Sequence, residues 1–436
     1  MTGAMYAAIA GLRTHMQNMN VIGHNIANVN TYGYKASRSV FKTALYTSLN
    51  GGSNGTDTMG GINPSQIGYG ANVANVDIDM STGNYAVTGM ATDMMLAGDG
   101  FFLVGTKDLA ANFDGSSDDI NRLTSLTLTR VGDFQFRADG YLAKNDGNVL
   151  YGFLCTGLVT EAMLTGDDKD KYIGMNVGDP IFSDQLVPIR YPRVQAAHYY
   201  QIDPDTGEYV TETKEVDGKD VEVPVEFDID KDWDKIFDEN GKLLNTVSAE
   251  GLKIAYPKEG ENGHLVDAGY DPALKDSILT MGRFNSISID PNTGMITATS
   301  DDTKETVVIG CVAIGTVTNP NGVTSMGDNY YKAGPGSGQL TIAVGGGNAA
   351  AWGISQVNRS LWRPDEDNPN DSGVYDGLTI YASGTKIISN GLEMSKTDLA
   401  QEISQMILTQ RGYQANTRII TVTDSMLEEL VNMKRG

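Results

Sequence analysis

The sequence LAQEISQMILTQRGYQANTRIITVTDSMLEELV, residues 399–431, decides the fold expected for this chain. Within it, mostly apolar side chains recur in alternating steps of four and three residues. These side chains are Leu399, Ile403, Met406, Gln410, Tyr413, Thr417, Ile420, Asp424, Leu427 and Val431. The spacing is that of heptad a and d positions, and it predicts a helix over about 394–435, roughly 60 Å long at ~1.5 Å per residue. Ser395, with Asp398 three residues later, resembles a capping box and predicts a helix start near 395.

The amino-terminal segment has the same periodicity, carried by Met5, Ile9, Leu12, Met16, Met19, Gly23 and Ile26. Neither end adjoins a strand pattern that could supply a core, and both stripes include glycine or polar residues. Such a stripe is a poor core for one molecule, but it suits helices that pack against copies of themselves. We therefore expect the two ends to pair with each other and then with neighbouring subunits. The alternative is an amphipathic helix that packs on its own globular core.

The charge of the chain is concentrated in its middle. The 436 residues have a formal net charge of −23, yet residues 1–45 carry four basic and no acidic side chains, and residues 391–436 carry five basic and six acidic ones. Residues 46–390 therefore hold −26. A deficit of Lys and Arg argues against nucleic-acid binding, and no window approaches the ~18 uninterrupted apolar residues of a membrane-spanning helix. The amino terminus also lacks the features of a cleaved secretory signal.

Between the ends, the pattern changes from linker to strand. Residues 46–72 contain seven glycines and one charge, whereas from Val73 apolar and polar residues alternate and are separated by turn sequences. The predicted fold is mainly β with paired terminal α-helices, and a second β-domain is inserted in the first. The predicted domains are a helical polymerisation domain (1–35 and 392–436), a glycine-rich linker (36–72), an inner β-domain (73–157 and 284–391) and an acidic outer β-domain (158–283).

Motifs at both ends resemble one known family. The amino-terminal sequence NIANVNTYGYK is similar to the signature of flagellar rod and hook axial proteins, through Asn25, Ile26, Ala27, Asn28, Asn30, Thr31, Gly33, Tyr34 and Lys35. The closing segment resembles that of the same family through Leu392, Glu393, Ser395, Asp398, Leu399, Gln410, Arg411, Gly412, Tyr413, Gln414, Ala415 and Asn416. Because Asn and Gly tolerate left-handed geometry, we interpret the asparagines of the first motif as residues that end a helix and turn the chain.

The resemblance implies a structural, non-enzymatic subunit of the bacterial flagellum. It implies export without a cleaved signal through the type III apparatus, an extracellular location at the hook and basal body, and assembly into a tube that transmits torque. The implied partners are copies of the chain, the hook cap, the distal rod, the hook–filament junction proteins and the export apparatus. An insert of roughly 125 residues favours the hook, with a distal rod subunit as the alternative. The expected subunit interface comprises Met5, Ile9, Leu12, Met16, Met19, Ile26, Leu399, Ile403, Met406, Gln410, Arg411, Tyr413, Gln414, Asn416, Ile420 and Leu427.

No catalytic, cofactor or metal site is predicted. The acidic residues Asp228, Asp230, Asp232, Asp234 and Glu239 match the positions of a calcium loop, but Trp233 occupies the position that needs glycine. Cys155 and Cys311 lie in apolar stretches and are expected to be buried, inert thiols. A different class of function also remains open, namely a secreted acidic binding protein or enzyme whose activity lies in residues 158–283.

Overall fold

The computed structural model divides the chain into two compact units. The helical unit comprises Met1–Asn84 and Met394–Gly436, and the β unit comprises Tyr85–Glu393. The structure describes all residues except 1, 53, 56–58, 108–124, 166–175, 184–185, 217–218, 230–231, 239–241, 260–264, 268–278, 339, 346–379, 384 and 434–436.

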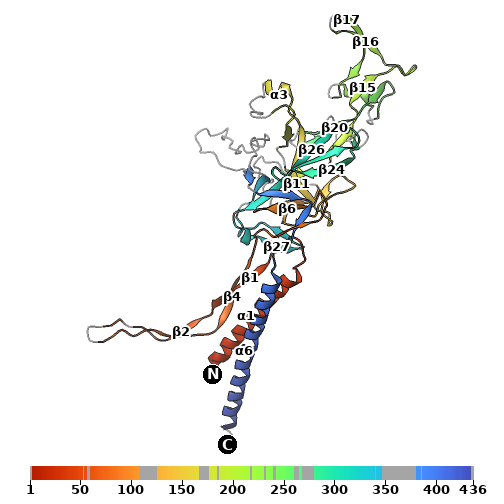
Figure 1. Ribbon diagram of the computed structural model, residues 1–436. Helices are drawn as coiled ribbons and strands as arrows, with labels where there is room; N and C mark the ends of the chain where they lie inside the picture. Colours follow the sequence, from red (N-terminus) through yellow and green to blue (C-terminus); the bar gives the residue numbers. More distant parts are fainter. Residues whose placement is uncertain are drawn as a thin grey trace. The chain divides into compact units, whose positions relative to one another are not determined.

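Two long helices and four strands form the helical unit. Its elements are α1 (Thr2–Ala27), β1 (Ser37–Thr43), β2 (Tyr46–Asn50), β3 (Ser65–Gly68), β4 (Ala71–Ile78) and α6 (Leu399–Met433). Figure 1 shows α1 and α6 side by side, with both chain ends at the same end of the pair. The two terminal helices predicted from the heptad spacing are therefore present, and they run antiparallel.

The start of α6 differs from its prediction. The helix begins at Leu399, because Asp398 Oδ1 accepts hydrogen bonds from the backbone N–H groups of Ala400 (3.0 Å) and Gln401 (3.2 Å). Asp398 is thus the N-cap. The predicted start near 395 was wrong because Ser395 Oγ accepts from the N–H of Thr397 in a local turn (3.2 Å).

The predicted glycine-rich linker over 36–72 contains β1, β2, β3 and the start of β4. β1 pairs with β4 from Ser37↔Ile78 to Thr43↔Ala71, and β2 pairs with β3 in a two-stranded arm that projects from them (Figure 1). Gly70 has a φ of +100°, and a Cβ there would lie 2.9 Å from the backbone oxygen of Ala7 in α1. Glycine at this position therefore allows the strands to pack closely on the helix. From composition alone, the same glycine was interpreted as a sign of a flexible linker.

The β unit is built on one large sheet of fourteen strands. Its central path runs β24 (Phe284–Ile289), β25 (Met295–Ser300), β26 (Thr306–Val317), β11 (Val149–Leu158), β7 (Phe101–Gly105), β8 (Thr127–Thr129), β28 (Tyr330–Lys332) and β27 (Thr324–Gly327). Joined to this path are β9 (Gln135–Phe136), β10 (Leu142–Ala143), β12 (Pro180–Phe182), β13 (Val187–Pro188), β29 (Leu340–Gly345) and β30 (Ile380–Ser383). The fully buried side chains of Phe102, Phe134, Ile296 and Val312 belong to its core.

Shorter strand pairs lie outside the large sheet. β5 (Tyr85–Val87) pairs with β32 (Gly391–Glu393), and β6 (Met94–Ala97) pairs with β31 (Lys386–Ser389). The described residues of this part also form two short helices, α3 (Glu161–Thr165) and the 3₁₀ helix η2 (Pro320–Gly322).

The inserted part has its own small sheets. Its elements are β14 (Arg193–Gln195), β15 (His198–Gln201), β16 (Thr211–Val216), β17 (Lys219–Pro224), β18 (Glu226–Phe227), α4 (Trp233–Ile236), β19 (Val247–Glu250), β20 (Lys253–Ala255), β21 (Pro257–Glu259), β22 (Leu265–Asp267) and β23 (Thr280–Met281). A second core around Tyr199, Ile236 and Val247 holds it together.

The insert begins later than its predicted start at 158. β12 and β13 both pair with β11, so their backbone hydrogen bonds assign residues 180–188 to the large sheet. The chain leaves this sheet at Tyr191 and returns at Phe284. There the Tyr191 ring stacks between those of Phe136 (3.8 Å between centroids) and Phe284 (4.7 Å). The acidic residues after 158 suggested a separate domain too early, because composition does not reveal strand pairing.

Candidate assembly surface of the terminal helices

Small and polar side chains form the seam between α1 and α6. The facing pairs are Gly11 with Asn416, His15 with Gly412, Asn18 with Thr409 and Asn25 with Glu402. As the numbers rise along α1 they fall by equal steps along α6, so the antiparallel pair keeps one register. Among the large apolar side chains of the described part of α1, only Ile22 is fully buried. The described part of α6 buries Thr409 and Thr423.

Asn25 is the centre of this seam. Its side chain is 1% exposed, and its Nδ2 donates to the backbone oxygen of Ser37 (2.8 Å) and to Glu402 Oε1 (3.0 Å). Its Oδ1 accepts from the Ser37 N–H (2.9 Å) and from the Tyr34 hydroxyl (3.0 Å). One side chain thereby joins α1, the start of β1 and α6. The Tyr34 oxygen also lies 2.7 Å from His24 Nδ1, which is the donor because the Tyr34 proton is directed to Asn25.

Glu402 places a carboxylate in the seam. Burial raises its pKa above the ordinary value, the hydrogen bond from Asn25 opposes that change, and nearby Asp398 adds to it. Its second oxygen, Oε2, is buried and has no hydrogen-bond partner in the described part of the chain. The ionised form of Glu402 is therefore disfavoured by folding.

The remaining residues of the amino-terminal motif turn the chain from α1 into β1. Asn28 Nδ2 donates to the backbone oxygen of His24 (2.9 Å), and Thr31 Oγ1 donates to Asn28 Oδ1 (3.2 Å). Gly33 has a φ of +66°, which favours glycine. Lys35 is buried, and its Nζ donates to the backbone oxygen of Ser81 (2.7 Å). The bonds of Asn28 and Thr31 are local to the turn, whereas Lys35 reaches Ser81, which follows β4. Asn30 is exposed.

The expected interface residues divide into two groups. The partly buried ones are Met5, Ile9, Leu12, Met19, Ile26, Met406, Asn416, Ile420 and Leu427. The exposed ones are Met16, Leu399, Ile403, Gln410, Arg411, Tyr413 and Gln414. Most of the apolar positions predicted on the two helices thus flank the polar seam and retain exposed surface.

Exposed apolar residues of α6 also lie outside the predicted set. Leu408 is 71% exposed and Val422 54% exposed, and Met426 is also exposed. The constant register places Thr2, the first residue of α1, level with Ser425, so the last two turns of α6 extend beyond α1. The seven-residue repeat of Glu402, Thr409, Asn416 and Thr423 is the sequence signal that could have located the seam. It was missed because polar residues at this spacing are also common on an exposed helix surface.

Comparisons with known proteins agree with the two end motifs. The model of the family "Flagella basal body rod protein" matches residues 5–35, and that of "Flagellar basal body rod FlgEFG protein C-terminal" matches residues 388–433. Flagellar hook proteins FlgE of Borreliella burgdorferi and Treponema pallidum are 25% and 23% identical, with all of each chain covered. The flagellar basal-body rod protein FlgG of Bacillus subtilis is 24% identical, again over all of both chains.

The chain belongs to the flagellar rod and hook protein family. It is accordingly a structural protein of the bacterial flagellum and not an enzyme. The family match at 5–35 covers Asn25, Tyr34 and Lys35, whose side chains all make buried structural contacts in this chain.

The two-stranded arm of this family member carries further exposed apolar residues. Leu45, Tyr46, Leu49, Ile62 and Ile67 are all exposed on β2, β3 and the residues beside them. The segment 46–72 has a single charge. An arm with only one charge and these side chains on its surface extends the apolar surface of the helical unit.

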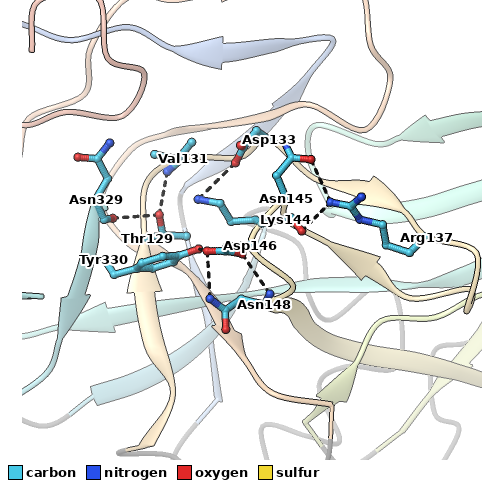
Figure 2. A network of polar contacts seen from close by, with 10 residues as sticks. All are labelled: Thr129, Val131, Asp133, Arg137, Lys144, Asn145, Asp146, Asn148, Asn329 and Tyr330. Carbon is cyan, nitrogen blue, oxygen red and sulfur yellow. Dashed lines mark hydrogen bonds and ion pairs between the residues drawn. The ribbon is translucent and has the colours of Figure 1, made fainter. Parts of the chain in front are cut away.

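The β unit contains a polar network around Lys144, drawn in Figure 2. The Lys144 ammonium lies 3.3 Å from Asp133 Oδ1 and 4.8 Å from the centroid of the Tyr330 ring. The Tyr330 hydroxyl donates to Asp146, whose carboxylate also accepts from the backbone N–H of Asn148 (3.1 Å). Burial raises the pKa of Asp146, but these hydrogen bonds outweigh burial and leave it lowered. The network ties loops of the large sheet together through paired charges.

A second buried contact of the β unit joins its ends to the sheet. Arg130 Nη1 lies 3.7 Å from Glu393 Oε2, and both side chains are fully buried. Burial lowers the pKa of Arg130, while the charge of Glu393 opposes that change. Glu393 belongs to β32, so this ion pair holds the strand on which the chain leaves the β unit.

The described residues also bear on metal binding, on the state of the two cysteines and on membrane-spanning helices. These contain no cluster of three His, Cys, Asp or Glu side chains that could hold a metal ion, and Asp230 and Glu239 of the calcium-loop pattern lie outside them. Cys155 and Cys311 are free and buried. Burial raises the pKa of the Cys155 thiol to about 12, and it also raises that of Cys311. None of the helices searched is long and apolar enough to cross a membrane.

Proposed function

We propose that this protein is the subunit of the flagellar hook and that it self-assembles through its terminal helices into a flexible tube that transmits torque. One observation carries the proposal, namely the placement of polar residues in the seam within the chain and of apolar residues on the outside of the helices. Leu408, Ile419 and Val422 all remain exposed on α6. A surface of this kind is typical of a face that packs against another protein.

The size of the exposed apolar surface suits assembly. Fully burying a Leu, Ile, Val or Met side chain is worth roughly 1.5–3 kcal/mol, so burying the exposed half of one contributes about 1 kcal/mol. Leu399, Ile403 and Met426 are each about half exposed, in addition to the three side chains named above. When one subunit contacts several neighbours, the summed free energy of these apolar contacts can offset the translational and rotational entropy that the subunit loses on association. A head-to-tail contact that does not close on itself gives a helical filament.

A bending tube also needs contacts that can shift. Apolar contacts are non-directional, so small changes of packing between helices cost little, whereas the hydrogen-bonded seam keeps α1 and α6 of one subunit together. The acidic middle of the chain, with its −26 charge, favours exposure to water on the outside of the tube.

The family and the resemblance support the remaining parts of the proposal. They are export through the flagellar type III apparatus without a cleaved signal, an extracellular position, and contact with the hook cap, the distal rod and the hook–filament junction proteins. Relatives that match the whole chain include hook proteins and a rod protein, so the insert at 193–281 is our reason to favour the hook. Electron microscopy of cells that lack the gene tests this choice. Loss of the hook with an intact rod supports it, and loss of the distal rod refutes it.

Polymerisation of a shortened chain tests the mode of assembly. The β unit, residues 85–393, lacks both terminal helices. Purified under conditions in which the full chain forms tubes, this fragment is expected to stay monomeric in sedimentation and to retain its strand content. Tubes formed by the fragment alone contradict assembly through the ends.

A further inference from the structure

We propose that His15 and Gly412 form a register lock that selects one of several possible alignments of α1 and α6. The proposal starts from the polar ladder, which we define as Gly11, Asn18 and Asn25 on α1 with Glu402, Thr409, Asn416 and Thr423 on α6. Members of the ladder recur every seven residues on both helices. A single buried Asn in a helix pair fixes the alignment, but a repeated one does not.

Sliding α6 by one heptad preserves polar partners along the ladder. In one direction, Asn18 moves from Thr409 to Asn416, and Asn25 moves from Glu402 to Thr409. Amide and hydroxyl side chains can hydrogen-bond in both arrangements, because each carries donors and acceptors. The Ser39 hydroxyl donates to Asn18 Oδ1, and Asn25 exchanges hydrogen bonds with the Ser37 backbone. These bonds join α1 to β1, so they do not depend on the position of α6. The hydrogen bonds of the ladder therefore hold the helices together without by themselves choosing the alignment.

The contact between His15 and Gly412 breaks this equivalence. A Cβ built on Gly412 would lie 2.6 Å from Cε1 and 2.7 Å from Nε2 of the His15 ring. The ring thus occupies the space that a side chain at this position of α6 would fill. The ring also meets Phe41 of β1 edge-on, with 6.1 Å between centroids, which limits the positions that the ring can take. Sliding by one heptad brings Ile419 or Gln405 to His15, and both carry side chains that collide with it.

Gly11 of α1 makes a close contact of the same kind, because a Cβ built on it would lie 2.8 Å from Asn416 Nδ2, but Gly23 does not. Gly23 of α1 has no atom within 4 Å of a Cβ built on it, so its missing side chain is not required by packing. The tether at the start of α6 is the competing explanation for the alignment. There Lys396 Nζ lies 3.5 Å from Asp79 and donates to Ser81. This ion pair is largely exposed, and such pairs contribute little.

Distances between spin labels test the lock in the full chain. Gln17 and Gln410 are exposed and lie level with each other in the observed alignment, so both are replaced by Cys and labelled. Cys155 and Cys311 are buried and are left in place. The labelled chain is diluted in an excess of unlabelled chain, and pulsed electron resonance measures the distance within one molecule. The parent chain is expected to give one narrow distance.

The variants give distinct results. His15→Ala is expected to add a second distance, displaced by up to about 10 Å for one heptad at ~1.5 Å per residue, with unchanged helix content. Gly412→Ala is expected to lose the native distance, and His15→Ala/Gly412→Ala is expected to recover it in part. Gly23→Ala and Lys396→Ala are expected to match the parent.

The proposal is overturned by any of four results. They are a broad distribution in the parent chain, a single native distance in His15→Ala, an unchanged distance in Gly412→Ala, and failure of the double variant to recover the native distance. A shift in Lys396→Ala with none in His15→Ala would assign the alignment to the tether instead. Loss of folding in Gly412→Ala does not prevent the test, because the double variant reports on the same contact.

Discussion

Replacing Asn25 by Ala is expected to open the junction between α1, β1 and α6. The variant removes the four hydrogen bonds of 2.8–3.0 Å that this side chain makes. It leaves the N–H and C=O of Ser37, the Tyr34 hydroxyl and a Glu402 oxygen without that partner. An orphaned buried polar group costs roughly 1–3 kcal/mol, and water can enter to reach part of this site. We therefore expect a loss of about 2–4 kcal/mol in the local stability of the junction.

Native-state hydrogen exchange measures this loss at a single amide. The Ser37 N–H is bonded to Asn25 Oδ1, so its protection reports directly on the junction. With about 1.4 kcal/mol for each factor of ten, the expected loss of protection is roughly 30- to 1,000-fold. The matched control is Asn28→Ala, in the same motif, which removes an exposed bond to the backbone of His24 and the bond from Thr31 but none to Ser37. It is expected to change the protection of Ser37 by less than about tenfold.

Two results would refute this reasoning. The first is an equal loss of protection in Asn25→Ala and Asn28→Ala, which would mean that burial and the number of bonds do not decide the effect. The second is rapid exchange of the Ser37 amide in the parent chain, which would mean that the junction is not formed.

Three further predictions follow from the buried charges and thiols. Folding raises the pKa of Glu402, so the protonated carboxyl group stabilises the folded chain fully below the ordinary pKa of 4.5. This stabilisation is lost as the pH rises through the pKa of Glu402 in the folded chain. Glu402→Gln should therefore raise the melting temperature at pH 7 but not at pH 4. Glu393→Ala should destabilise the β unit to urea by about 3–5 kcal/mol, because it leaves Arg130 buried and unpaired, and Arg130→Met/Glu393→Leu should recover most of this; an effect below about 1 kcal/mol would contradict the argument. Burial, which raises the pKa of both Cys155 and Cys311, should keep them unreactive toward a thiol reagent until the chain is unfolded, and fast labelling of the native chain would disprove it.

The two terminal helices could be predicted from the sequence, because heptad spacing can be recognised in a single chain without knowing what the helices pack against. The spacing does not identify which face meets which neighbour. It favoured the apolar stripe through Ile403 and Ile420, while the seam within the chain uses Thr409 and Asn416. Polar side chains look alike on a surface and in a seam until the facing helix supplies their partners.

Other differences have a similar origin. The linker predicted over 36–72 contains strands, and its Gly70 allows close packing on α1, a use of glycine that composition cannot distinguish from flexibility. The predicted outer domain started too early because β12 pairs with β11, a contact between distant segments. Asn25 was expected, with the other asparagines of the motif, to end a helix and turn the chain, but its bonds to Tyr34, Ser37 and Glu402 could be found only from the positions of three elements.

The most direct measurement of the central claim is polymerisation of the full chain with the exposed stripe of α6 made polar. The variant is Ile419→Ser/Val422→Ser/Met426→Ser, which changes three exposed side chains and leaves the seam with α1 intact. Electron microscopy and sedimentation are expected to show tubes for the parent chain and monomers for the variant, with equal helix content and equal protection of the Ser37 amide. Tubes formed by the variant at the same protein concentration as the parent would contradict assembly through the terminal helices.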